Sequence, residues 1–70
     1  MRRFLVVIEK AKGNYSAYSP DLPGCAATGR TKAEAENNMY EAIRMHLQGM
    51  VEDKLSIPVA SSMAEYMAVK

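Results

Sequence analysis

The chain opens with apolar residues at consecutive positions, Phe4–Ile8, instead of at alternate ones. Successive side chains of a strand point to opposite faces of a sheet, so both faces of an extended segment over Arg3–Glu9 would be apolar. One face would carry three of these side chains and the other face two: Phe4, Val6 and Ile8, then Leu5 and Val7. A strand that is apolar on both faces needs cover on both, and this pattern predicts a central strand.

A second strand is predicted after a short turn. Residues 10–14 end in Gly13-Asn14, and such a turn composition between two strand-like runs is typical of a β-hairpin. From Tyr15 to Ser19 the side chains alternate between two faces with aromatic weight, which suits a half-buried pleated surface. The first two strands are therefore predicted to be antiparallel neighbours.

The second strand is predicted to end at a Pro-Asp-Leu-Pro-Gly corner, residues 20–24. Pro20 lacks the amide hydrogen that a strand ladder needs, and Gly24 can adopt the positive φ that other residues resist. Leu22 is the one apolar side chain in this corner, and we expect it to fold back onto the core. The small residues Cys25–Gly29 are interpreted as a third strand, because the chain must then return to a helix.

A helix is predicted from Thr31 to about Glu52. Thr31-Lys32-Ala33-Glu34 places a hydroxyl three residues before a carboxylate, as a capping box does. Apolar side chains then recur at helical spacing and form one stripe: Ala35, Met39, Ala42, Ile43, His46 and Met50. This stripe predicts that the helix covers one face of the sheet.

The pattern after the helix leaves two alternatives open. Pro58 marks a loop that leaves the helix. Ser62 to Glu65 could cap a second helix, whereas Met63, Met67 and Val69 would also share one face of a strand.

Seventy residues allow one domain, residues 1–70, of a size that commonly depends on disulfides, metals or association. The single cysteine cannot form an internal disulfide, and one thiol with one histidine falls short of a zinc ligand set. We therefore expect no cofactor, and we expect a homo-oligomer. The net charge of +1 does not indicate a polyanion-binding surface. Because the run Phe4–Ile8 is too short for a signal peptide or a membrane span, we expect a cytoplasmic protein without a membrane partner.

No residue type in the chain points to catalysis. His46 lies within the apolar stripe, where a neutral structural histidine is favoured over a catalytic base. Cys25 has no evident base nearby and no helix start beside it, so a buried small residue is favoured over a nucleophile. Asp21 and Glu9 are the acidic residues near the strands, whereas a metal-dependent nuclease needs several converging carboxylates. We expect no catalytic residue, no metal site and no enzymatic activity.

Several segments, in this order, resemble one protein family. Residues 15–25 read Tyr-x-Ala-Tyr-x-Pro-Asp-Leu-Pro-Gly-Cys, residues 28–35 read Thr-Gly-Arg-Thr-x-x-Glu-Ala, and Asn38-x-x-Glu41-Ala42-Ile43 and Ile57-Pro58 follow. This order resembles the HicB family of antitoxins. The resemblance implies an α+β fold of order β-β-β-α-β, a partial ribonuclease H-like fold with one helix packed on a small mixed sheet. It implies that the C-terminal segment is a fourth strand beside the first, which agrees with the usual right-handed connection between parallel strands.

The resemblance also implies a function and a partner. A HicB-like protein would bind and neutralise a HicA-like toxin, a small ribonuclease that cuts messenger RNA, with the family motif in the turn at Asp21, Leu22, Pro23 and Gly24. Many members also carry a C-terminal DNA-binding domain, and because this sequence ends at Lys70 we expect none in this chain. The alternative is an orphan HicB-like protein that acts as an oligomeric binding or scaffold protein without a toxin.

The expected homo-oligomer is a dimer or a tetramer that associates through the sheet face left uncovered by the helix. One helix can cover only one of the two apolar faces of the first strand, and an exposed apolar patch commonly marks an interface. Pairing of strand edges is a competing geometry. The candidate interface residues are Leu5, Val7, Tyr18 and Met45.

Overall fold

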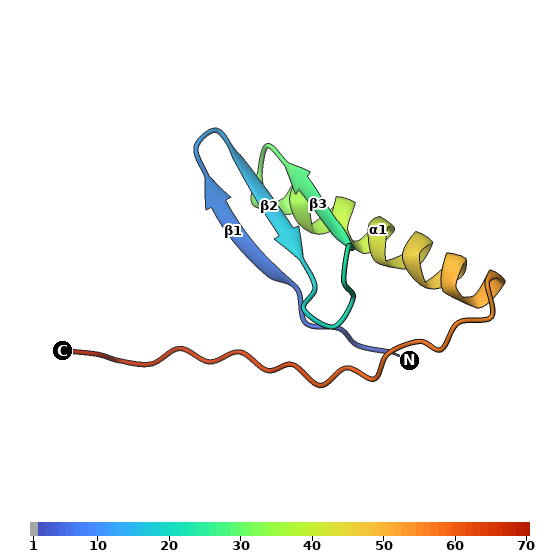
Figure 1. Cartoon of the computed structure of the whole chain (residues 1–70). Helices are drawn as coiled ribbons and strands as arrows, with labels where there is room; N and C mark the ends of the chain where they lie inside the picture. The colour runs from blue at the N-terminus through green and yellow to red at the C-terminus, as the bar shows by residue number, and fades with distance from the viewer. Residues whose placement is uncertain (1) are drawn as a thin grey trace.

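The computed structural model describes residues 2–70, which form a three-stranded antiparallel sheet with one helix against one face (Figure 1). The strands are β1 (Val7–Ala11), β2 (Asn14–Tyr18) and β3 (Ala26–Gly29), and the helix is α1 (Lys32–Glu52). The strand order β1-β2-β3 places β2 at the centre of the sheet. The α+β class, the antiparallel hairpin, the third strand and the extent of the helix are therefore confirmed.

The prediction that the first strand is central was wrong, because β1 lies at an edge of the sheet. It also begins later than predicted, at Val7, which pairs with Tyr18 at the end of β2. Pro20 has no amide hydrogen with which to extend this ladder. Phe4 and Val6 precede the strand but still pack against the core.

The core lies between α1 and one face of the sheet. Its buried cluster consists of Ala17, Leu22, Cys25 and Met39. The strand register aligns Ile8, Ala17 and Ala27 across the sheet, and all three belong to the core or pack against it. Half-buried side chains from the N-terminal segment, β1, β3 and α1 surround the cluster: Phe4, Val6, Ile8, Ala27, Ala42, Ile43 and Leu47. The helix therefore covers the face to which Ile8 belongs.

The start of α1 is fixed by its cap. The Glu34 N–H donates to Thr31 Oγ1 at 3.0 Å, as the capping-box pattern predicts, and Glu34 Oε1 accepts from the Arg30 N–H at 3.1 Å. Farther along α1, Asn38 Nδ2 donates to the Thr28 carbonyl at 2.8 Å and ties the helix to β3. No helix in the described part of the chain is both long and apolar enough to cross a membrane.

The contact between β3 and α1 is close because Gly29 has no side chain. A Cβ at Gly29 would lie 2.8 Å from the Glu34 carbonyl carbon and 2.9 Å from Ala35 Cα. Both atoms belong to the backbone of the first helical turn, which cannot rotate away as a side chain can. Glycine at this position therefore lets the helix start directly against the end of β3.

The C-terminal segment, residues 55–70, forms neither a helix nor a strand. The predicted fourth strand beside the first is therefore absent from residues 2–70, and the sheet is antiparallel instead of mixed. The segment passes the end of the sheet at which β2 stops, and then leaves the body in an extended path (Figure 1). Ser61 and Ser62 are hydrogen-bonded to Asp21 there, which directs the segment across the end of the sheet instead of along β1.

Candidate functional site

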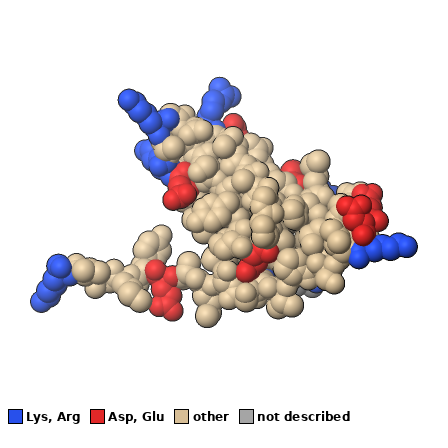
Figure 2. Space-filling model, viewed as in Figure 1, with Lys and Arg blue, Asp and Glu red and all other residues tan. Residues whose placement is uncertain are grey.

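The sheet face opposite α1 is a candidate surface for contact with another protein. Val7 alternates with the core residue Ile8 in β1 and so lies on this face, and Tyr18 is the cross-strand partner of Val7. Leu5 precedes β1 and is assigned to this face by continuing the alternation. We call these three residues the outer face. Leu5 and Val7 are half-buried, and Tyr18 is 42% exposed. The middle of the molecule in Figure 2 shows few charged side chains, and a charge-poor patch with an aromatic side chain is typical of the centre of an interface.

Met45, the fourth candidate interface residue, lies on a different surface. It belongs to α1 and is 71% exposed. Its side chain lines a shallow hollow with Gly24, Cys25 and Ala26, where β3 begins. The strand register therefore pairs Val7 with Tyr18, whereas Met45 lies at the hollow beside the start of β3.

The predicted corner is a compact turn around one buried side chain. Leu22 is 1% exposed, as expected for a residue that folds back onto the core. Its N–H donates to the Ser19 carbonyl at 3.1 Å, and its carbonyl accepts from the Cys25 N–H at 3.0 Å. Gly24 has a φ of 82° and Pro23 is exposed at the tip. This turn places the Asp21 side chain at the end of the sheet.

Asp21 holds the C-terminal segment through a set of hydrogen bonds that we call the serine latch, formed by Asp21, Ser61 and Ser62. Asp21 Oδ2 accepts from the Ser61 and Ser62 N–H groups, each at 3.1 Å. Asp21 Oδ1 accepts from the Ser62 hydroxyl at 2.9 Å and from the Ser61 hydroxyl at 3.3 Å. One carboxylate therefore fixes the point at which the segment leaves the body.

The serine latch favours the ionised form of Asp21. Its pKa is held below the ordinary value of 3.8, first by the Ser62 N–H and then by the Ser62 hydroxyl, with smaller help from Ser61. Partial desolvation opposes these hydrogen bonds without reversing the direction. The latch is therefore intact at neutral pH and has a negative charge at its centre.

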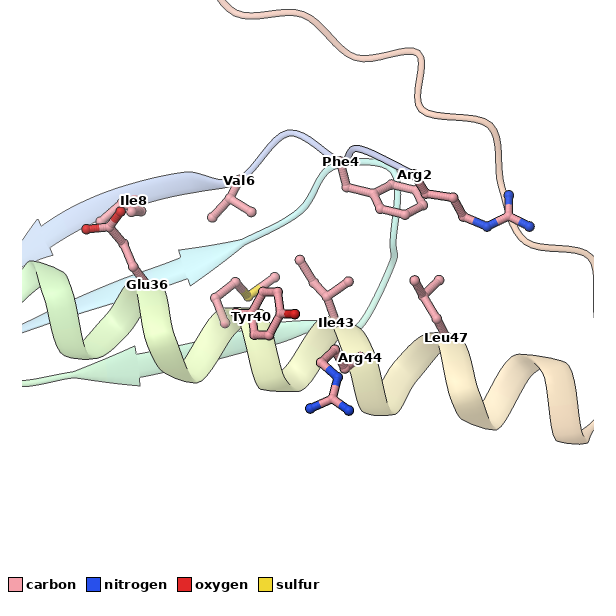
Figure 3. Close-up of a pocket in the computed structure, with 10 residues that line it drawn as sticks. Arg2, Phe4, Val6, Ile8, Glu36, Tyr40, Ile43, Arg44 and Leu47 are labelled. Carbon is pink, nitrogen blue, oxygen red and sulfur yellow. The ribbon is translucent and has the colours of Figure 1, made fainter.

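A groove lies between the N-terminal segment with β1 on one side and α1 on the other. Figure 3 shows Phe4 and Val6 on one wall and Tyr40, Ile43 and Leu47 on the other. Its volume is about 700 Å³, and Arg2, Glu36 and Arg44 lie among its otherwise largely apolar lining. The groove opens at one edge of the sheet, beside β1, which like β3 has a neighbouring strand on one side only among residues 2–70.

Comparison with known proteins shows to which family this chain is related. The family described as HicB-like antitoxin of bacterial toxin–antitoxin systems matches residues 4–70. The chain belongs to this family. A UPF0150 protein of Thermoplasma acidophilum is 34% identical over 58 residues, which cover 83% of this chain and 84% of the relative.

Two further similarities define what the HicB-like chain shares with its relatives. An uncharacterised 14.9 kDa protein from the rep-hol intergenic region of Haemophilus phage HP1 is 39% identical over 62 residues, 89% of this chain. This chain spans 47% of the length of that phage protein. One chain of a solved HicA3 and HicB3 toxin–antitoxin complex matches with a TM-score of 0.68 at 24% identity, covering 84% of this chain and 72% of that chain. The structural match shows a shared fold.

Cys25 and His46 of this HicB-like chain line the same hollow, whereas Asp21 belongs to the serine latch. Burial raises the pKa of the Cys25 thiol, which opposes formation of the reactive thiolate. Within the part of the chain that the structure describes, no group of three or more His, Cys, Asp or Glu residues could hold a metal ion. His46 is half-buried near Cys25 at the hollow that Met45 also lines.

Sequence reasoning missed two features of the HicB-like fold. The serine latch joins residues 40 and 41 positions apart, and no local pattern marks such a pair. The groove depends on the edge position of β1, which the doubly apolar first strand did not suggest. One residue of the Pro-Asp-Leu-Pro-Gly corner could have indicated the serine latch. Asp21 is the one charged side chain in that corner, and a carboxylate there is available to accept hydrogen bonds from another segment.

Proposed function

We propose that this protein is an antitoxin that binds and neutralises a HicA-like, messenger-RNA-cleaving toxin. The observation that carries the proposal is the family match over residues 4–70. The fold shared with one chain of the HicA3 and HicB3 toxin–antitoxin complex supports it. In this proposal the partner is a protein, and the antitoxin acts by occupying the active surface of the toxin.

We propose the outer face as the contact surface for the toxin. A net charge of +1 gives little long-range attraction to a basic ribonuclease, so the contact has to rely on apolar burial and shape. Tyr18 combines a large apolar ring with a hydroxyl and is of the residue types enriched at interface hot spots. Burial of the outer face against the toxin would remove Leu5, Val7 and Tyr18 from water together.

Neutralisation by this route needs no chemistry from the antitoxin. The toxin supplies the catalytic groups, and the antitoxin excludes RNA by covering them. The protein alone should therefore leave RNA intact with or without magnesium or manganese. Metal-dependent cleavage that survives stringent purification and is lost on Asp21→Ala would contradict a purely binding role.

The proposal is tested by co-expression with a HicA-like toxin, chosen by inspecting the adjacent reading frames for a short basic protein, followed by affinity purification through a tag on the toxin. We expect a complex, and we expect Tyr18→Ala and Val7→Lys to weaken it. Val59→Lys is the matched control, because it makes the same substitution at an 86% exposed position outside the outer face. Circular dichroism checks that each variant is folded.

The outcome also separates the antitoxin from the orphan scaffold. A folded protein that fails to co-purify with a HicA-like toxin encoded beside it would contradict the antitoxin proposal and favour the scaffold. Equal loss of binding for Val7→Lys and Val59→Lys would contradict the outer face as the contact surface, without contradicting toxin binding itself.

A further inference from the structure

The last eight residues, 63–70, contain large apolar side chains that are almost fully exposed. The exposed fractions are 89% for Met63, 106% for Tyr66, 80% for Met67 and 88% for Val69. They project from the body in an extended path, and the long axis of the molecule reaches 46 Å (Figure 1). A contiguous exposed apolar segment of this kind is typical of an interaction element.

The spacing of these residues is that of a strand. In an extended chain Met63, Met67 and Val69 share one side with Glu65, while Ala64, Tyr66 and Ala68 share the other. Both sides are therefore mainly apolar. A strand with two apolar sides suits a position where one side enters a core and the other continues an apolar sheet face.

A matching position is the free edge of β1, which is one of the two edge strands of the described sheet and the one that lies beside the groove. This strand is hydrogen-bonded to β2 on one side only within residues 2–70, so its other side presents unpaired backbone groups. Directly beside that edge lies the groove, with Phe4, Val6, Met39 and Ile43 among its apolar lining (Figure 3). An added strand at this edge would place one row of side chains in the groove and the other row beside the outer face.

The serine latch determines which copy of the chain can supply this strand. Asp21 holds Ser61 and Ser62 at the end of the sheet, and the residues after them continue away from β1 (Figure 1). To fill its own groove the chain would have to reverse direction immediately after the latch. A second copy can fill the groove while the latch and the outward path of the segment stay as they are.

We propose that Met63–Val69 of one copy adds as a strand to the β1 edge of a second copy and inserts Met63, Met67 and Val69 into its groove. The exchange is reciprocal, so that two copies form a two-fold dimer. At about 3.3 Å per residue the segment spans roughly 23 Å, the length of β1 together with two of the residues before it. The proposal does not depend on toxin binding, since the groove and the outer face lie on different sides of β1.

Isotope-filtered nuclear Overhauser spectroscopy on a mixed dimer tests the exchange directly. One copy is labelled at the methionine methyl groups and the other at isoleucine and valine, and the two are mixed under denaturing conditions and refolded. We expect contacts between chains from the Met63 and Met67 methyl groups to Ile43 and Val6. Contacts within one chain only, or between the two C-terminal segments only, would overturn the proposal.

Introducing a charged side chain into the segment Met63–Val69 gives a second test of the exchange. Met67→Lys should weaken dimerisation roughly tenfold or more in sedimentation equilibrium, because the groove would have to accept an ammonium group. Val59→Lys, before the latch, should leave the dimer unchanged, and both variants should keep the circular dichroism of the parent. A monomeric parent at high micromolar concentration, or equal effects of the two variants, would overturn the exchange.

Discussion

The packed body of the chain and the C-terminal segment contain similar apolar side chains in different surroundings. Met39 on α1 is 1% exposed, whereas Met67 is 80% exposed. Both lie in segments with regular apolar spacing, so the local pattern does not explain the difference. Met39 faces β2 and the corner of its own chain, and Met67 faces no element within the described residues. A regular pattern thus predicts that an element has a partner without saying which chain supplies it.

The largest effect on stability is expected when the buried side chain of Met39 is removed from the core. Met39→Ala should lower the free energy of unfolding by about 2–5 kcal/mol, the range for removing a buried large side chain, and could unfold so small a domain. Met45→Ala is the matched control, because it makes the same change on the same helix at an exposed position. Urea denaturation at low protein concentration measures both. Equal effects would break the distinction between packed and exposed methionines.

The next effect concerns how closely the body is packed. Gly29→Ala should cost about 1–3 kcal/mol, because its Cβ meets the backbone of the first turn of α1 and pushes β3 from the helix. Gly49→Ala has open space around its Cβ and should stabilise the helix by up to about 1 kcal/mol. Thermal unfolding of the two variants should shift in opposite directions. A neutral Gly29→Ala would show that this contact is looser than described.

A smaller effect is expected at the start of the helix. Thr31→Ala removes the acceptor of the Glu34 N–H and should cost about 0.5–2 kcal/mol. Thr31→Ser keeps the hydroxyl and should restore most of that loss. If the serine variant were as unstable as the alanine variant in urea denaturation, the cap would not be the source of the effect.

The smallest effect on stability is expected when acid releases the C-terminal segment from the serine latch. The folded-state pKa of Asp21 is lowered, so the latch contributes above the ordinary value of 3.8 and is lost as the pH falls through the lower folded-state pKa. The protection factors of the Ser61 and Ser62 amides, which compare each exchange rate with the intrinsic rate at the same pH, should therefore stay constant at neutral pH and fall once the pH drops below 3.8. Asp21→Asn should show little protection of these amides at any pH. Protection that persists in Asp21→Asn would contradict the latch.

Local patterns were sufficient for most of the body. Thr31 and Glu34 predicted the start of the helix, because their hydrogen bond closes within one turn. Leu22 was predicted to be buried as the one apolar side chain of its corner, and it is 1% exposed. Gly24 adopts the positive φ that its turn requires. Each of these predictions depends on residues close together in the sequence, and the structure confirms all of them.

Contacts between residues far apart in the sequence could not be predicted from local patterns. The first strand has two apolar faces, which predicted a central position, yet β1 is an edge strand in the described chain. The predicted fourth strand is likewise absent among residues 2–70, where Asp21 instead holds Ser61 and Ser62. The two discrepancies meet at one place, since the vacant edge of β1 is where a fourth strand would lie. Met45 was named as a candidate interface residue because it falls on the polar side of the helix, and that position does not say with which other residues it shares a surface.

In the function that we propose, this HicB-like protein silences a HicA-like toxin by covering its active surface. The most direct measurement titrates the protein into purified HicA-like toxin and follows cleavage of a messenger RNA by gel electrophoresis. We expect cleavage to stop once antitoxin saturates the toxin, and to require more of Tyr18→Ala than of Val59→Lys for the same effect. Undiminished cleavage with excess folded protein would contradict the account.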